Sequence, residues 1–182
     1  MKMIRPNAFG KRFGLEPNTW TRGASFGKFH REASMVDKEL LSRKLSQLRE
    51  YLSALHNAGD ITWEKYEEDL RARAFVERYL QLCIEKVIDI GNHFVSFHRW
   101  REPVGYRDLF QVLHENGIIP RKHLKTFQNM ASFRNMLVHR YEKTDNEVIF
   151  GIFRKRLNDF ELFIGLIMDW IKGQETSPSA KP

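Results

Sequence analysis

Leucines recur along residues 41–55 at the spacing of an α-helix, and this pattern constrains the fold of the chain more than any other feature. Steps of four and three residues alternate along the segment, so its leucines share one face of a helix. They are Leu41, Leu45, Leu48, Leu52 and Leu55. We expect this helix to begin at Met35 and to end at Asn57-Ala58-Gly59, a sequence typical of helix C-termini.

Four more segments have helical periodicity, and none is convincing as a strand. The second predicted helix begins near Thr62, which can act as its N-cap, and runs to about Phe97 with an expected bend at Gly91. The others are expected over 106–115, from Pro120 to Tyr141, and over about 147–172. Short loops between amphipathic helices predict an all-α fold, an up-and-down bundle of about five helices.

The two ends of the chain lack this periodicity. Residues 1–34 predict an irregular basic extension, residues 35–172 the helical bundle domain, and residues 173–182 a flexible tail. The net charge is +7, and the extension accounts for most of it with seven basic and two acidic side chains. The remaining 148 residues hold 23 basic and 21 acidic side chains. Nucleic-acid binding must therefore be argued from a local site rather than from overall charge.

Length and cysteine content indicate one globular domain in a reducing compartment. The 182 residues are 42% hydrophobic, which is enough for a core without disulfides or a structural metal. Cys83 is the single cysteine, and its place on an apolar helix face predicts a core position. No apolar run approaches the roughly 20 residues of a membrane span. We expect a cytoplasmic protein that does not enter a membrane.

The helix after Pro120 carries an arginine within an apolar stripe. Steps of three and four residues place one set of side chains on a single face: Leu124, Phe127, Ala131, Arg134, Val138 and Tyr141. Burial of an unpaired guanidinium is costly, so Arg134 must meet a carboxylate inside the fold or face a groove that binds an anion. Asp89 is expected either to serve helix packing or to pair with Arg134, and not to act in catalysis.

A second stripe of the same helix consists of small polar residues, which suggests a cleft or a subunit contact. They are Gln128, Ser132, Asn135 and His139. Imidazole titrates near about pH 6.5, so His139 could exchange protons with ribose oxygens while Arg134 stabilises a phosphate, without a metal. The simpler alternative is an internal ion pair for Arg134 and a capping role for His139.

Further candidate ligands flank this helix or precede it. Five basic residues could follow an RNA backbone, although a solvated face is the default explanation: Arg121, Lys122, Lys125, Arg140 and Lys143. His93 and His98 are five residues apart and lack the carboxylate of an HExxH arrangement, so no metal site is expected. No glycine-rich phosphate loop is evident, and no cofactor is expected.

Residues 134–141, RNMLVHRY, fit the form R-N-x-x-V-H-x-Y of the R-x₄-H-x-Y motif, and the chain thereby resembles the HepT toxins of the HEPN superfamily. Residues 83–91, CIEKVIDIG, are similar to that family's second-helix signature. Residues 103–120, PVGYRDLFQVLHENGIIP, are similar to its following helix and loop. The resemblance covers roughly residues 35–172.

The resemblance implies a metal-independent endoribonuclease that acts as a homodimer, with two motifs facing each other across a shared cleft. Arg134 would orient and stabilise the scissile phosphate of the RNA substrate, His139 would act as general acid and base, and Asn135 would help to hold the site. The family's cognate antitoxin is a nucleotidyltransferase called MntA. It would add AMP to Tyr141 and silence this toxin of a type VII-like toxin–antitoxin system, because the added phosphates repel RNA.

Two other functions remain open from the residues alone. One is a non-catalytic HEPN module that binds nucleotide or scaffolds a partner nucleotidyltransferase. The other is a plain helical-bundle oligomer in which an internal carboxylate occupies Arg134 completely. Cleavage of RNA by the purified protein would distinguish the ribonuclease from both of these alternatives.

Overall fold

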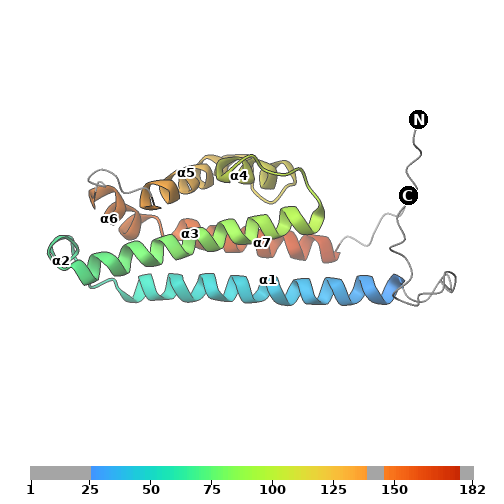
Figure 1. Cartoon of the computed structure of the whole chain (residues 1–182), viewed down its shortest axis with the longest axis horizontal. Helices are drawn as coiled ribbons and strands as arrows, with labels where there is room; N and C mark the ends of the chain where they lie inside the picture. Colours follow the sequence, from blue (N-terminus) through green and yellow to red (C-terminus); the bar gives the residue numbers. More distant parts are fainter. Residues whose placement is uncertain (1–25, 139–145, 177–182) are drawn as a thin grey trace, which may run out of the picture. The chain divides into compact units, whose positions relative to one another are not determined.

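The computed structural model describes residues 26–138 and 146–176, and within these ranges every regular element is an α-helix (Figure 1). The helices are α1 (Phe26–Asn57), α2 (Trp63–Glu68), α3 (Leu70–His98), α4 (Tyr106–Glu115), α5 (Arg121–Val138), α6 (Asn146–Lys155) and α7 (Asn158–Thr176). The predicted all-α class is confirmed. The described helices number seven rather than about five.

Two predicted helices are each divided in the structure. Thr62 does cap a helix, since its hydroxyl accepts a hydrogen bond from the Lys65 backbone N–H at 3.3 Å. That helix ends after six residues, because Asp69 is extended (φ −96°, ψ 105°) and its carboxylate caps α3 through the Arg71 N–H at 2.7 Å. Near the C-terminus, a break at Arg156 and Leu157 separates α6 from α7. Apolar periodicity continues across both breaks, so it did not reveal them.

The helix boundaries at the two ends of the chain also differ from expectation. α1 begins at Phe26, nine residues before Met35, so the prediction that the first helix starts at Met35 is wrong. Extending an existing helix costs far less than nucleating one, and a segment without apolar periodicity can therefore join it. α7 continues to Thr176, past the predicted end at Lys172. The chain divides after Asp37 into two units, and the packed core described here belongs to the second, from Lys38 onward. The proposed domain boundaries remain a prediction.

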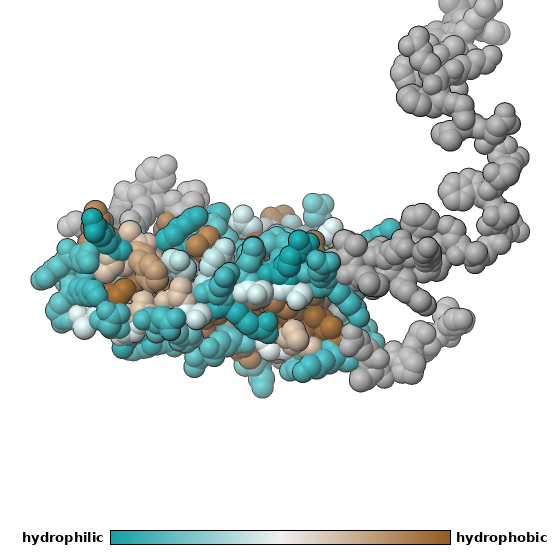
Figure 2. Space-filling model, turned by 90° about the horizontal axis from the view of Figure 1, so that it is seen from below, coloured by the Kyte–Doolittle hydropathy of each residue, from teal (hydrophilic) through white to brown (hydrophobic). Residues whose placement is uncertain are grey.

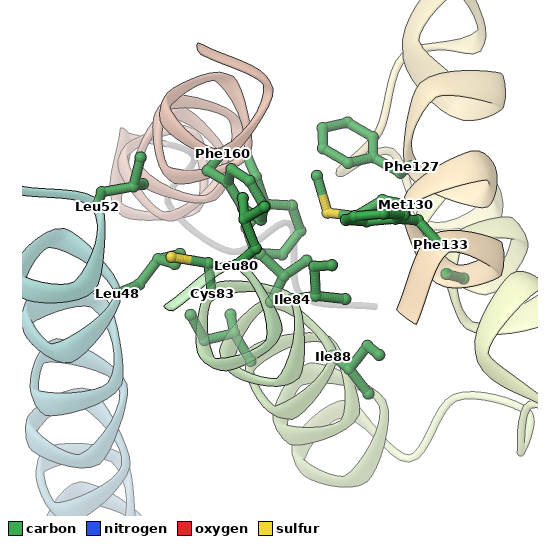
Figure 3. Packing of buried hydrophobic residues seen from close by; sticks show 14 of the residues in the cluster. Leu48, Leu52, Leu80, Cys83, Ile84, Ile88, Phe127, Met130, Phe133 and Phe160 are labelled. Carbon is green, nitrogen blue, oxygen red and sulfur yellow. The ribbon is translucent and has the colours of Figure 1, made fainter. Parts of the chain in front are cut away.

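The core of this second unit is built around α3. Figure 3 shows Leu80, Cys83 and Ile84 of α3 between Leu48 and Leu52 of α1 on one side and the side chains of α5 on the other, with Phe160 of α7 above them. Eleven residues of α3 are buried: Ala72, Val76, Leu80, Cys83, Ile84, Val87, Ile88, Ile90, Gly91, Phe94 and Val95. All five leucines of the predicted α1 stripe are buried as well. Full burial of each large apolar side chain contributes about 1.5–3 kcal/mol, and this packing fixes α3 as the scaffold for its neighbours.

Gly91 has a different role from the expected bend. α3 continues through it as a single helix to His98. A Cβ at this position would lie 3.1 Å from Leu109 Cδ2 and 3.2 Å from Leu113 Cδ1, two buried side chains of α4. The absent side chain therefore permits α4 to pack closely on α3.

The surface of the described unit is mixed in character. Figure 2 shows hydrophilic side chains over most of one face, with smaller hydrophobic patches between them. None of the described helices combines the length and the hydropathy needed to cross a membrane.

Candidate functional site

α5 places Arg134 at the edge of the core, as its sequence pattern predicts. Leu124, Phe127 and Ala131, which precede Arg134 on the apolar stripe, are all buried. Phe127 stacks on Phe110 of α4 and meets Phe163 of α7 edge-on, so α5 is fixed from two sides. Arg134 follows on the same face, with its side chain 21% exposed. The guanidinium is therefore held by a rigid helix and still reaches solvent.

Among the described residues, the carboxylate that pairs with that guanidinium is loosely associated with it. Arg134 Nη2 lies 3.9 Å from Glu85 Oε1 on α3, which is an ion-pair distance but too long for a hydrogen bond. Arg134 Nε is buried and has no hydrogen-bond partner among the described residues. An unsatisfied buried donor costs about 1–3 kcal/mol. Arg134 thus keeps unused donor capacity, which an incoming anion could satisfy.

An aromatic ring also contacts Arg134. Its Cζ lies 5.2 Å from the ring centroid of Tyr106, the first residue of α4, in a cation–π arrangement. Tyr106 is 38% exposed, so the ring lies at the surface rather than in the core. Three helices, α3, α4 and α5, therefore contribute to the surroundings of one guanidinium.

Of the two roles expected for Asp89, the structure shows helix packing and not pairing with Arg134. Asp89 pairs instead with Lys44 of α1 at 2.6 Å and with Lys86 of α3 at 3.4 Å. Glu85 lies one helical turn before Asp89, and it is the carboxylate that faces α5. Both residues are on α3, but the crossing of the helices decides which of them meets Arg134.

Several predicted site residues lie outside what the structure describes. His139, Arg140, Tyr141 and Lys143 fall between the two described ranges, and the side chain of Asn135 is also outside them. Their roles stay predictions.

The basic residues at the start of α5 are described. Arg121, Lys122 and Lys125 are exposed there. At 1.5 Å per residue they lie about 14–20 Å from Arg134 along the helix axis, so they are not part of its immediate surroundings.

Sequence reasoning missed Glu85 and Tyr106 as neighbours of Arg134. Both occur in the segments that carry the family resemblance, CIEKVIDIG and PVGYRDLFQ. The resemblance of these segments was the available signal. Glu85 lies 49 positions and Tyr106 lies 28 positions before Arg134, and no local spacing links residues so far apart in the sequence.

Cys83, His93 and His98, the other residues considered for chemistry, pack against neighbouring side chains. Cys83 is fully buried, as predicted, and burial raises the pKa of its thiol to about 12. His93 stacks on Phe97, and His98 stacks on Trp100 and meets Trp170 edge-on. Across residues 26–138 and 146–176, no group of three or more His, Cys, Asp or Glu side chains is arranged to hold a metal ion.

Comparison with known proteins gives consistent matches. Residues 41–167 match the family model described as ribonuclease HepT-like. The mRNA nuclease HepT of Shewanella oneidensis is 26% identical over 130 residues, which cover 71% of this chain and 96% of that protein. The tRNA nuclease HepT of Aphanizomenon flos-aquae is 23% identical over 136 residues, covering 75% and 92%.

Solved structures agree with these sequence matches. A tri-AMPylated Shewanella oneidensis HEPN toxin, solved in complex with an MNT antitoxin, aligns with a TM-score of 0.65 and 26% identity over 71% of this chain and 96% of that one. The Bacillus subtilis protein YutE aligns with a TM-score of 0.66 over 80% of this chain and 97% of its own, and at 18% identity this likeness shows the fold alone.

Proposed function

Because this chain belongs to the HepT-like ribonuclease family, which its residues 41–167 match, we propose that it is a metal-independent endoribonuclease and the toxin of a toxin–antitoxin pair. The observation that carries the proposal is the position of Arg134. Its guanidinium is carried by α5, remains partly exposed, and has a buried donor without a hydrogen-bond partner in the part of the chain that the structure describes. Such a group is suited to hold a phosphate.

In the proposed mechanism, Arg134 binds the non-bridging oxygens of the scissile phosphate. Its planar set of donors fits two of these oxygens and stabilises the charge that grows on them in the transition state. His139 takes the proton from the ribose 2′-OH and returns one to the leaving 5′-oxygen. Asn135 helps to hold the site. The 2′-oxygen attacks phosphorus as the bond to the 5′-oxygen breaks, so the products carry a 2′,3′-cyclic phosphate and a 5′-hydroxyl.

The proposal includes a homodimer whose two motifs share one cleft. Arg121, Lys122 and Lys125, together with Arg140 and Lys143, would bind RNA phosphates beyond the scissile one. The exposure of the first three supports this role, since a long-chain cation must reach the RNA backbone.

RNA cleavage tests the catalytic part directly. The purified wild-type protein should cleave RNA in EDTA and leave 2′,3′-cyclic phosphate ends. Arg134→Ala and His139→Ala should each lower the rate by about 100-fold or more, because each removes a group that acts in the transition state. Arg49→Ala, which removes an exposed arginine of α1, is the matched control and should cleave like the wild type.

Equal activity of Arg134→Ala, His139→Ala and the wild type would refute the catalytic assignment. Absence of cleavage by the wild type, together with stable binding of a nucleotidyltransferase, would support the non-catalytic module instead.

Silencing by nucleotide transfer is the second part of the proposal. The relative that was solved with an MNT antitoxin is described as tri-AMPylated, and Tyr141 is the motif tyrosine here. Co-expression with the cognate nucleotidyltransferase should add AMP to this chain, as measured by intact mass, and should abolish RNA cleavage. Tyr141→Phe should carry no added mass. Adducts that persist in Tyr141→Phe would place the modification elsewhere.

A further inference from the structure

Two residues outside the R-x₄-H motif contact the guanidinium of Arg134, and they do so in different ways. Tyr106 faces it with its ring at 5.2 Å, and Glu85 approaches Nη2 at 3.9 Å. We propose that both are positioning residues. Tyr106 sets the plane of the guanidinium, and Glu85 holds it in a resting state from which the substrate phosphate displaces the carboxylate. This inference rests on the proposed function.

The geometry of Tyr106 is suited to orient Arg134 without using its donors. Arg134 Cζ lies over the face of the Tyr106 ring, and this cation–π contact does not require a hydrogen bond from the five N–H groups of the guanidinium to an oxygen. The ring can therefore restrict rotation of the guanidinium and leave its edge available for phosphate oxygens. Tyr106 begins α4, and α4 packs closely on α3 at Gly91, so the ring has a rigid support.

The geometry of Glu85 is suited to a contact with Arg134 that a phosphate can easily displace. Its Oε1, the oxygen nearest Arg134, also accepts a hydrogen bond from the Gln81 side-chain amide at 2.8 Å. Gln81 lies one turn earlier on α3 and holds this oxygen on its own helix. The carboxylate therefore attracts Arg134 electrostatically without a hydrogen bond. A phosphate oxygen that reaches hydrogen-bond distance would bind the guanidinium more strongly than Glu85 does.

The two roles predict opposite kinetic effects. Tyr106→Leu should lower kcat by about tenfold, because a freely rotating guanidinium is less often aligned, whereas Tyr106→Phe should retain activity because it keeps the ring. Glu85→Gln should lower KM by about threefold to tenfold with little change in kcat, since the amide preserves shape but no longer competes for the cation. Phe97→Leu, an exposed aromatic residue of α3, is the matched control and should behave like the wild type.

A second measurement does not depend on cleavage. Binding of a 2′-O-methyl RNA oligonucleotide, which lacks the attacking hydroxyl, should tighten about threefold to tenfold in Glu85→Gln. The same substitution in an Arg134→Ala background should have no effect, because the guanidinium for which Glu85 and the RNA phosphate compete is then absent. A purely structural role would lower the melting temperature and would not improve RNA binding.

The outcomes separate this inference from the proposed function. If Arg134→Ala is inactive while Tyr106→Leu and Glu85→Gln match the wild type in kcat, KM and RNA binding, the positioning roles are wrong and the ribonuclease assignment stands. If Arg134→Ala cleaves RNA normally, the catalytic assignment of Arg134 in the proposed function fails. Tighter RNA binding by Glu85→Gln in both backgrounds would also overturn the role of Glu85, because the effect would then come from general charge.

Discussion

At the scale of single residues, burial has opposite consequences for Cys83 and Arg134. Cys83 has no exposed surface and lies among apolar neighbours, so its neutral thiol form is favoured and its pKa rises to about 12. Arg134 lies at the edge of the same core, and its buried Nε has no hydrogen-bond partner among the described residues. The first side chain is chemically inert, whereas the second is available to an anion.

The Cys83 thiol should therefore resist modification in the folded protein. With a pKa of about 12, only about 10⁻⁴ of the thiol is ionised at pH 8, and the thiolate is the reactive form. An aromatic disulfide reagent at pH 8 should label the native protein very slowly. It should label the protein rapidly in guanidinium chloride, where the thiol returns to its usual pKa and becomes accessible. Equal rates in the two conditions would contradict burial of Cys83.

At the scale of helices, the site depends on how closely α4 packs against α3. Gly91 permits this approach, and α4 in turn carries Tyr106 to Arg134. The ion pairs of Arg101 with Asp108 and Glu115 tie the segment before α4 to that helix. The position of the Tyr106 ring is thus a result of packing between helices as well as of its place at the start of α4.

Substitution of Gly91 should separate these two helices. Gly91→Val would force its methyl groups into Leu109 and Leu113 and should lower the free energy of unfolding by about 1–3 kcal/mol. Gly165→Val is the matched control on α7, since a Cβ there meets nothing within 4 Å. That control should leave stability unchanged or raise it slightly, because valine favours the helix over glycine. Chemical denaturation measures both, and a similar effect of the two substitutions would contradict close packing at Gly91.

At the scale of the whole molecule, the described core and the site share the same helices. α3 contributes buried residues along most of its length, and it also supplies Glu85 at the surface beside α5. α5 contributes Phe127 and Ala131 to the core and then Arg134 to the site. The proposed catalytic arginine is therefore positioned by the packing that stabilises the fold, which limits how far it can move when RNA binds.

The amino-acid sequence by itself determined the all-α class, the buried leucine face of α1, the core position of Cys83 and the placement of Arg134 on an apolar stripe. These features follow from periodicity, which is local and records which side of a helix is buried. The motif also identified the family. Only the tertiary structure decided that Glu85 rather than Asp89 faces Arg134, that Tyr106 covers its guanidinium, and that Gly91 serves helix packing. Contacts between helices depend on their crossing and on side-chain shape, which no spacing within one helix specifies.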